Sequence, residues 1–528
     1  MAISVRELGA RGDGTTTDTA ALQAAIDRCT AEGGGTVLVP AGTYLTAPLT
    51  LGDCVTLHLE AGATLVATTD LDDYAVEDDP WSGESRRCGL VTAVGARNVS
   101  IVGRGVIDGG GPAFVDLDRP RGPSDLDVAR TRQGERYLDY LLKSTHGPCE
   151  HGERPGNLVR FRDCENVLVR GVTICNSPTW TVQFNRCDGV RVDGVRIHSH
   201  ASDNRVPNDD GIDLRVCRNV SISGCDIDTG DDCIAVFGSR NVTVTGCTLR
   251  SRSAGIRLSF SGGETRNCAI GNVVMDGCNR GICVQVRGPG SVRDVEVNGA
   301  VIRTQLYTGQ WWGNGEPIHV SVLPSGRGGG ELGGVSGIRF ANINAQAENG
   351  ILLYGCGESP IENVAFDNVR LHVRRSGLHG ACGGNFDLRG GRSPATQVFE
   401  HDVPGLFGRF VRGLDVRDMR LSWDEGLPDF FTHGLWLEEF RDLHLAGFAG
   451  GPSPAATDGA AVALSDGQGV TIRGCRADAG TPVFLRHEGV DGPGLLVGND
   501  FSGAARGIVP SEHDFTVADN LPPRGNSS

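Results

Sequence analysis

Apolar and polar residues alternate over short stretches that recur at regular intervals along the chain. Four segments have apolar residues at positions two, four, seven and nine, Asn or Gly at position one and Gly at position six: 166–174, 189–197, 219–227 and 241–249. Their first residues are 23, 30 and 22 positions apart. Alternation predicts strands, and a period near 22 residues predicts the coils of a solenoid. The longer interval predicts about eight extra residues of loop within 198–208.

The same pattern continues in fainter copies toward the C-terminus. They lie at 338–343, 361–371, 411–421, 440–445 and 470–475. A chain of 528 residues is too long for one compact core but can grow along one axis as a repeat. We therefore predict an all-β fold, a right-handed parallel β-helix forming a single domain over residues 1–528. We expect the N-terminal cap and first coils in 1–65, a loop excursion in 70–156, central coils with the active site in 157–375, and C-terminal coils and loops in 376–528.

A short amphipathic helix is expected to cap the first coil. Leu22, Ala25, Ile26 and Cys29 recur on one helical face, and three glycines at 33–35 end the pattern. Asp18 is placed to accept hydrogen bonds from free amides at the helix start. Two other segments break the rhythm, 70–156 and 377–404, and loops of this kind commonly wall a binding cleft.

Composition narrows the class of partner. The 78 glycines and 22% charged residues favour tight turns between short strands, and the net charge of −16 argues against a nucleic-acid partner. No signal peptide is visible in 1–14 and no apolar stretch is long enough to span a membrane. We expect a cytoplasmic protein with no membrane partner; the oligomeric state is left open.

The 17 cysteines follow the register of the repeat. Cys164, Cys187 and Cys217 each precede a repeat, and Cys225 and Cys247 occupy its seventh position. Equivalent positions in successive coils stack, so we predict interior ladders of reduced thiols. No spacing typical of a zinc site is present, and no cofactor or metal is predicted.

Two acidic clusters stand out from this regular background, 208–213 and 230–233. Asp210 and Asp231 are 21 residues apart, about one coil, and Asp232 follows directly. Strands of adjacent coils are ~4.8 Å apart, so these carboxylates should lie side by side. Crowding like charges raises at least one pKa, and glycosidic cleavage requires one protonated and one ionised carboxyl group. Two other interpretations are a pair of Asp-rich turns and a calcium site.

At these residues the sequence resembles glycoside hydrolase family 28, the polygalacturonase family. The resemblance begins at 12–22 and 39–44 and continues through 105–109 and 176–180. It is strongest where 208–211, Asn-Asp-Asp-Gly, stands for the family's Asn-Thr-Asp, and 230–232 for its Gly-Asp-Asp. The resemblance implies that Asp231 is the general acid and that Asp210 and Asp232 activate water in an inverting displacement.

Two family motifs are replaced in this chain. Ala254 occupies the position of the histidine in the family's Gly-His-Gly, while Cys283 and Gln285 stand where the family has the Arg and Lys of Arg-Ile-Lys. Lys143 is the only lysine and lies far upstream. In pectin-cleaving members that basic pair is understood to hold a galacturonate carboxylate, so its replacement argues against plain homogalacturonan as substrate.

Other side chains are candidates for substrate binding. Trp311 and Trp312 are suited to stacking on a sugar and lie beside Glu316, and Arg257 or Arg287 could replace the missing cations. Asp387, Arg389 and His433 could line the cleft, although structural ion pairing is the favoured explanation for them. The predicted substrate-binding set is Asn208, Arg257, Gln285, Arg287, Trp311, Trp312 and Glu316.

The sequence therefore predicts a glycoside hydrolase with a carbohydrate substrate, exo-acting because long loops would block one end of a groove. Two alternatives use the same scaffold. A uronate lyase or epimerase would need a basic residue and calcium, and a sugar-binding rod without turnover would explain the missing histidine and lysine.

Overall fold

The computed structural model describes residues 1–77, 85–122, 126–142, 146–199, 203–259, 262–326, 331–391, 393–510 and 515–523. Lys143 and residues 200–202 of the predicted loop lie outside these ranges. The chain divides into two compact units. Unit 1 comprises Met1–Gly122, Leu142–Arg257 and Gly309–Trp311; unit 2 comprises Pro123–Leu141, Leu258–Thr308 and Trp312–Ser528. The single domain over residues 1–528 remains a prediction.

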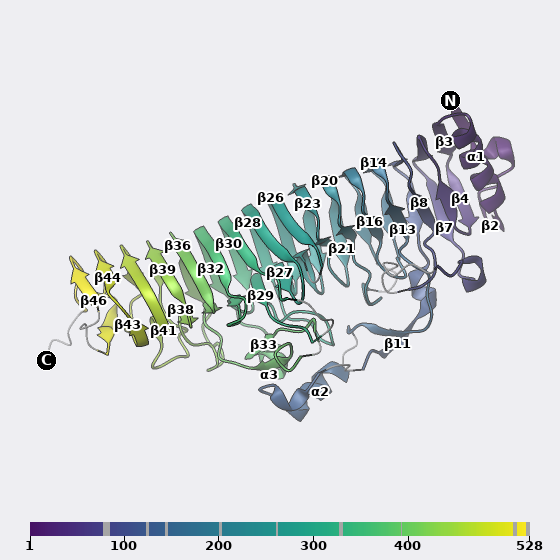
Figure 1. Cartoon of the computed structure of the whole chain (residues 1–528). Helices are drawn as coiled ribbons and strands as arrows, with labels where there is room; N and C mark the ends of the chain where they lie inside the picture. The colour runs from purple at the N-terminus through teal and green to yellow at the C-terminus, as the bar shows by residue number, and fades with distance from the viewer. Residues whose placement is uncertain are drawn as a thin grey trace. The chain divides into compact units, whose positions relative to one another are not determined.

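Unit 1 is built from three rows of parallel strands, in which successive strands come from successive coils (Figure 1). The first row contains β5 (Leu49–Leu51), β8 (Val91–Val94), β13 (Val159–Arg162), β16 (Val182–Asn185), β19 (Ile212–Arg215), β22 (Ile234–Phe237) and β25 (Ala254–Leu258). The second row contains β1 (Ala2–Ser4), β3 (Gly35–Val39), β6 (Val55–Leu59), β9 (Ser100–Gly103), β14 (Glu165–Arg170), β17 (Asp188–Asp193), β20 (Arg218–Ser223) and β23 (Arg240–Thr245). The third row contains β2 (Asp13–Thr17), β4 (Gly42–Thr46), β7 (Ala63–Ala67), β10 (Val106–Asp108), β15 (Thr173–Cys175), β18 (Arg196–His198), β21 (Asp226–Thr229) and β24 (Thr248–Ser251).

Unit 2 has two rows of strands, called long and short after their first strands, which have 13–15 and 4–7 residues. The 14-residue strand Ala460–Arg473 pairs with strands of both rows. The long row contains β26 (Glu264–Cys278), β28 (Ser291–Thr304), β30 (Val335–Ala347) and β32 (Ile361–Val373), followed by β36 (Val411–Arg417), β37 (Arg420–Trp423), β39 (Arg441–Ala446), β40 (Ala449–Gly450), β42 (Arg476–Ala477), β44 (Gly494–Val497) and β46 (Phe515–Ala518). The short row contains β27 (Arg280–Val286), β29 (Ile318–Val322), β31 (Ile351–Tyr354), β35 (Leu406–Arg409), β38 (Leu435–Glu438), β41 (Ala460–Arg473), β43 (Thr481–Asp491) and β45 (Ala504–Val509).

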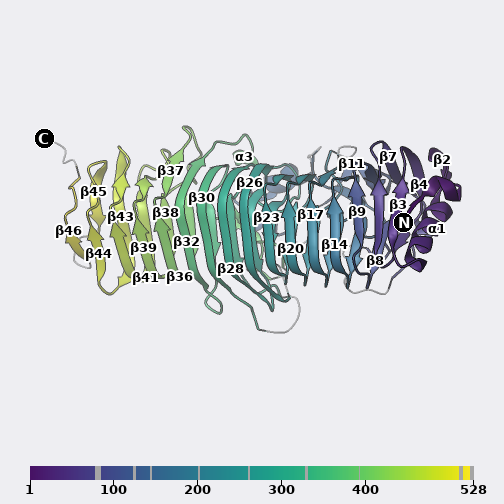
Figure 2. The same cartoon turned by 90° about the horizontal axis from the view of Figure 1, so that it is seen from above.

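The four strongest repeats of the sequence form adjacent strands, as predicted. Figure 2 shows β14, β17, β20 and β23 side by side, and Val167, Val190, Val220 and Val242 stack at one buried position of successive coils. The corner before each strand requires a left-handed backbone, which Asn and Gly adopt at least cost. Asn166, Asn219 and Asn241 have φ of 55–56° there and Gly189 has 73°. The weaker repeats fall on β30, β32, β36, β39 and β41 of unit 2.

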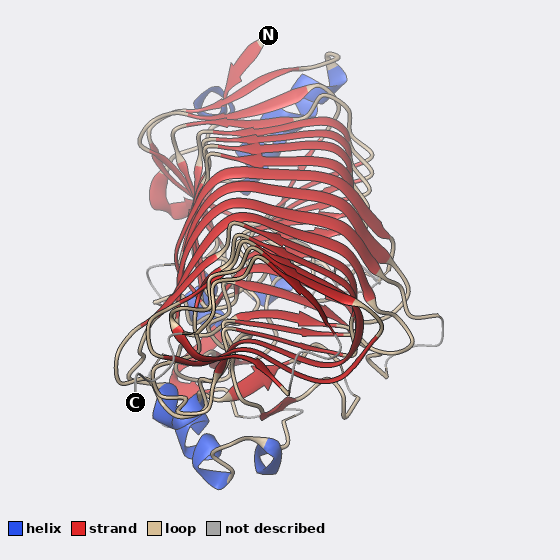
Figure 3. Ribbon diagram, turned by 90° about the vertical axis from the view of Figure 1, so that its left-hand side faces the viewer, coloured by secondary structure: helices blue, strands red, loops and turns tan. Residues whose placement is uncertain are grey.

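Helices are few in both units (Figure 3). α1 (Thr19–Ala31) buries Leu22, Ala25, Ile26 and Cys29 as predicted. Asp18 sits at its N-cap, but its side chain makes no hydrogen bond to the helix; the carboxylate accepts the backbone N–H groups of Arg11 and Gly12 at 2.6 and 2.9 Å. The remaining helices of the described residues are α2 (Glu135–Leu142), α3 (His379–Cys382) and the 3₁₀ turns Val5–Leu8, Leu71–Asp73, Gly111–Phe114 and Val128–Arg130. In the described part of the chain, no helix has the length and apolar character to cross a membrane.

The predicted excursions lie outside the coils, with one correction. Residues 70–156 are interrupted by a complete coil, β8, β9 and β10, because 98–103 repeats the Asn-led alternating pattern. The rest of that interval includes the antiparallel pair β11 (Val115–Pro120) and β12 (Cys149–His151). Segment 377–404 carries α3 and the antiparallel pair β33 (Asn385–Asp387) and β34 (Val398–Glu400), which lie beside β27 and β29 of unit 2 (Figure 1).

The cysteine ladders are confirmed. All 17 thiols are free, and 15 are buried. Cys54 alone is exposed and Cys356 is partly exposed. The buried thiols behave as small apolar side chains between coils.

The native protein should therefore react with a thiol reagent at one cysteine rapidly, at a second slowly, and at the others only on unfolding. Timed labelling with Ellman's reagent and mass mapping would check this, with a urea-unfolded sample as the total count. Rapid modification of Cys187 or Cys225 in the native state would contradict the ladder.

Candidate active site

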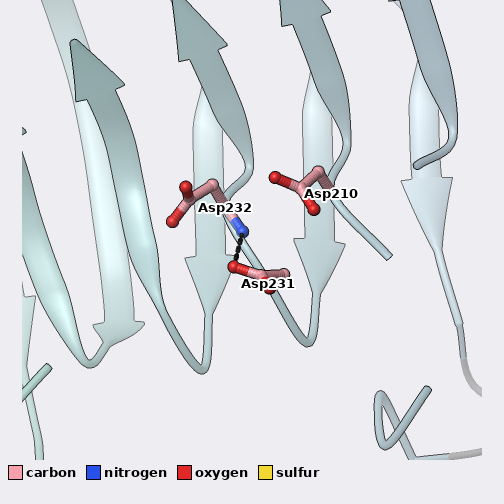
Figure 4. Close-up of side chains that lie close together, drawn as sticks. All are labelled: Asp210, Asp231 and Asp232. Carbon is pink, nitrogen blue, oxygen red and sulfur yellow. Dashed lines mark hydrogen bonds between the residues drawn. The ribbon is translucent and has the colours of Figure 1, made fainter. Parts of the chain in front are cut away.

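Three aspartates of unit 1 meet at the ends of two adjacent coils. Asp210 precedes β19, while Asp231 and Asp232 precede β22. Carboxylate oxygens of all three lie within 4.8 Å of one another. Figure 4 shows the Asp210 carboxylate directed toward Asp232, whose own carboxylate points away from Asp210, with Asp231 beside them. The predicted juxtaposition is confirmed.

The register differs by one residue from the predicted spacing. Ile212 pairs with Ile234, and the Gly211 N–H donates to the Asp232 carbonyl at 2.9 Å. Asp210 therefore lies opposite Asp232 and not opposite Asp231, because this coil is 22 residues long. The residue opposite Asp231 is Asp209.

Asp232 is held by a dense set of donors. Its Oδ1 accepts hydrogen bonds from the Ser253 hydroxyl at 2.7 Å, the Ala254 backbone N–H at 3.0 Å and Arg257 Nη2 at 3.1 Å. Arg257 Nε also contacts Oδ2. A buried carboxylate is tolerated when it is paired and hydrogen-bonded in this way. Arg257, predicted to bind substrate, lies in this ion pair.

Asp231 has the environment of a proton donor. Burial, followed by the charge of Asp232, raises its pKa to about 8, although Arg257 acts in the opposite direction. Its Oδ1 accepts the Asp232 N–H at 3.0 Å, which fixes the side chain. The carboxyl group is therefore protonated at neutral pH, as a general acid must be.

Asp210 has the least compensated carboxyl group of the three. Burial and the charge of Asp231 raise its pKa well above the usual range. Its Oδ1 is buried, and no described residue donates a hydrogen bond to it. This oxygen is accordingly a position at which a water molecule or a substrate hydroxyl can be bound.

Asp209 is a functional candidate that the sequence analysis left without a role. Its Oδ1 accepts the backbone N–H groups of Gly230 and Asp231 at 2.9 and 3.0 Å, so it holds the turn that carries the proposed acid. Burial raises its pKa to about 7, against the effect of these two bonds. Its charge in turn raises the pKa of Asp231. The sequence could have indicated this role, since Asp209 stands where the family's Asn-Thr-Asp motif has threonine.

Asp213 is a second buried carboxyl group near this cluster. It is fully buried on β19, and neither of its oxygens has a hydrogen-bond donor among the described residues. Burial raises its pKa well above the usual range, while Arg215 acts in the opposite direction. Its protonated form therefore needs no counterion.

The other predicted residues of unit 1 are engaged with the protein. Asn208 accepts a hydrogen bond from Arg154 Nη2 at 2.9 Å. Trp311 is 3% exposed and donates its indole N–H to the His146 carbonyl at 3.0 Å. A Cβ added to Gly230 would lie 3.0 Å from the Trp311 ring, so the indole packs against the turn before Asp231. The stacking role predicted for Trp311 does not fit this burial.

The predicted residues of unit 2 belong to a buried polar network. Glu316 pairs with Arg280 at 3.5 Å, and Arg280 pairs with Asp387 at 3.4 Å. Arg389 pairs with Asp387 at 2.9 Å and lies over the ring of Trp312, 5.1 Å from its centroid. The contacts of Glu316, Asp387 and Arg389 are those of buried ion pairs and do not fit the lining of an open cleft.

Gln285, at the position of the family's lysine, and the neighbouring Arg287 are also covered by other parts of the protein. Gln285 is fully buried, with its amide 3.4 Å from the Arg389 carbonyl. Arg287 donates to the Ser321 hydroxyl at 2.8 Å and to the Leu388 carbonyl at 3.1 Å. The segment 377–404 thus covers the outward side of β27, and the substrate-binding role predicted for these two residues does not fit their contacts.

The aspartate cluster also has the donor set of a divalent-cation site. A cation there would compete with Arg257 for the oxygens of Asp232, whose acceptors are already used. This competition favours acid–base chemistry over a metal site.

The chain is similar to known proteins of one glycoside hydrolase family. Residues 29–282 match the model of glycosyl hydrolases family 28. An exo-poly-alpha-D-galacturonosidase of Dickeya chrysanthemi is 30% identical over 44% of this chain and 41% of its own length. A probable polygalacturonase of Arabidopsis thaliana is 26% identical over 77% of this chain and 80% of its own length. A solved exopolygalacturonase of Thermotoga maritima has a TM-score of 0.59 at 20% identity, over 80% of this chain and 92% of that one.

These matches confirm the resemblance to family 28 and the right-handed parallel β-helix that the sequence predicted, and they agree with its prediction of a glycoside hydrolase. The match to the Dickeya chrysanthemi protein spans less than half of that protein.

Replacing Asp231 by Asn should stabilise the protein above neutral pH. The folded-state pKa of about 8 lies above the unfolded value of 3.8, so wild type loses stability as the pH rises between them, and the amide does not. We expect a gain in unfolding free energy of about 1–3 kcal/mol at pH 8 that disappears below pH 4. Urea titrations at several pH values would measure it, with the exposed Asp226→Asn as control. Equal stability of Asp231→Asn and wild type at pH 8 would contradict the raised pKa.

Proposed function

We propose that this chain is an inverting O-glycoside hydrolase in which Asp231 protonates the leaving oxygen while Asp210 and Asp232 activate the attacking water. One observation supports this above the others. Three carboxyl groups share a site within 4.8 Å, and the pKa of Asp231 is raised to about 8. Glycosidic hydrolysis needs this division between a protonated and an ionised carboxyl.

Arg257 supports the division of roles. Its ion pair with Asp232 supplies one positive charge to a cluster of buried carboxyl groups. The protonated Asp231 adds no second charge at neutral pH. Water bound between Asp210 and Asp232 would lose its proton to this pair while the leaving oxygen gains one from Asp231.

Inversion rests on the family resemblance. Carboxyl groups of inverting enzymes usually stand about 6.5–9.5 Å apart and those of retaining enzymes about 5–5.5 Å. The 4.8 Å limit here is between closest oxygen atoms, so the first anomer formed is the direct test of this part of the proposal.

The substrate we propose is a neutral or atypical oligosaccharide and not plain homogalacturonan. A galacturonate carboxylate needs a cation, and the side chains that could supply one are used elsewhere. Arg257 binds Asp232, Arg287 binds Ser321 and the Leu388 carbonyl, and Gln285 is neutral and buried. A charge-assisted hydrogen bond is worth ~1.5–3 kcal/mol, so its loss would weaken binding of an acidic unit by more than tenfold.

Exo action is the mode of cleavage we propose. The Dickeya chrysanthemi relative carries an exo-acting name. In addition, 377–404 covers the outward side of β27, which shortens the open stretch available to a long polymer on unit 2. The many free cysteines favour a reducing compartment, in keeping with the predicted cytoplasmic location.

Screening purified protein against neutral and acidic oligosaccharides, with and without EDTA, would test the reaction class. We expect hydrolysis that EDTA does not change, with inversion seen by proton NMR of the first anomer formed. Asp231→Asn should lower kcat by at least about a hundredfold, because it removes the transferable proton. Equal turnover by Asp231→Asn would exclude the acid assignment, and an ultraviolet-absorbing double bond in the product would indicate the lyase alternative. Binding without turnover would favour the sugar-binding rod.

Replacing Asp209 should shift the pH profile. Asp209→Asn keeps the acceptor for the Gly230 and Asp231 amides but removes a charge that raises the pKa of Asp231. We expect the alkaline limb of kcat/KM to move to lower pH by about 0.5–1 unit, with Asp209→Thr behaving alike. Asp193→Asn on the exposed side of β17 is the control. A loss of activity at every pH without a shift would indicate a purely structural role.

A further inference from the structure

The outward side of the last strands of unit 2 carries a groove of about 890 Å³, separate from the aspartate cluster in sequence. β38, β41 and β43, which form its floor, lie side by side in Figure 1. Trp436 on β38 pairs with Ala463 on β41, which pairs with Arg486 on β43. A single methyl group thus separates a large ring from a guanidinium.

The Trp436 ring is fixed in orientation but remains accessible. Phe407 and His433 meet it edge to face, with centroids 5.7 and 5.2 Å away and interplanar angles of 83° and 88°. The side chain is half-buried. Among the described residues, no acceptor binds its indole N–H, whereas Trp423 donates to the Gly451 carbonyl at 3.0 Å. An immobilised indole with a free donor is the feature that stacks on the C–H face of a sugar ring.

Polar groups around the ring are suited to hydroxyl groups. His433 accepts the Ala460 N–H at Nδ1, at 3.0 Å, and burial lowers its pKa to about 4. The neutral ring therefore carries its proton at Nε2, where it can donate. Arg486 lines the same groove with a side chain that is 36% exposed. Ser465 and Glu488 add an acceptor-rich edge to the groove.

The charge balance of the groove selects against polyanions. Asp458 accepts hydrogen bonds from Arg486 at 2.7 Å and Arg506 at 3.5 Å. Glu488 and Asp491 bring two more negative charges to the lining residues. The carboxylates outnumber the two guanidinium groups, so an acidic sugar would meet repulsion and a neutral one would not.

From this arrangement we propose that the groove is a second, non-catalytic saccharide-binding site. It takes a neutral sugar ring stacked on Trp436 above Ala463, with its hydroxyl groups bound by His433 and Arg486. This site is independent of the proposed hydrolysis, because none of its residues belongs to the aspartate cluster.

Calorimetry on the Asp231→Asn protein would test the site without turnover. The probes are neutral tetrasaccharides of xylose, arabinose and galactose, with tetragalacturonate as the acidic counterpart. We expect Trp436→Ala to lower affinity at the groove by at least about tenfold, Trp436→Phe to retain part of it, and Trp423→Phe to match the parent. If the aspartate site also binds the probe, the stoichiometry falls from two to one in Trp436→Ala; if it does not, from one to zero.

A second variant distinguishes a loss of binding from a loss of folding. Arg486→Met keeps the aliphatic stem, removes the donors and should weaken binding about fivefold, while circular dichroism confirms the fold. The proposal is overturned if no neutral tetrasaccharide binds, if Trp436→Ala and Arg486→Met bind as the parent does, or if only tetragalacturonate binds.

Discussion

The proposed active site depends on the register between two successive coils. Because Ile212 pairs with Ile234, Asp210 must face Asp232 across the spacing of neighbouring strands, and Asp231 comes with it. Carboxylates this close repel one another, and burial makes each charge more costly. The chain meets that cost with one guanidinium and with protons retained on the other groups. Proton retention is also the property that a general acid needs.

The departures from the family pattern are connected through this electrostatic balance. Ala254 stands at the histidine position, and its backbone N–H still binds Asp232 at 3.0 Å. Asp209 replaces threonine and adds a titratable group whose carboxylate binds the backbone N–H of Asp231, the proposed acid. Arg257 neutralises Asp232 directly. Charge on neighbouring side chains can thus tune the acid where the ring of a histidine is absent.

The fold was predictable because its information is local and repeated. Asn corners, alternating valines and stacked cysteines each specify one coil, and their period specifies the solenoid. The aspartate cluster followed from that period, although its register was off by one residue, because a coil length cannot be fixed from sequence to single-residue accuracy. The contacts of Gln285, Arg287 and Glu316 were not predictable. Their partners lie on the segment 377–404 or on neighbouring coils, and no local pattern indicates which outward positions such a segment covers.

This covering segment also bears on specificity. The buried Arg280 is shared by Glu316 and Asp387, and Asp387 binds Arg389 as well. Burial alone would raise the pKa of Asp387, but Arg389 and Arg280 hold it well below its usual range. Removing one member would leave a buried charge unpaired, which is strongly destabilising. Cations committed to such a network cannot be released to bind a uronate without that penalty. The stability of this network is thus one physical reason for the neutral substrate that we propose, whose recognition would rely on shape and on groups that bind hydroxyls.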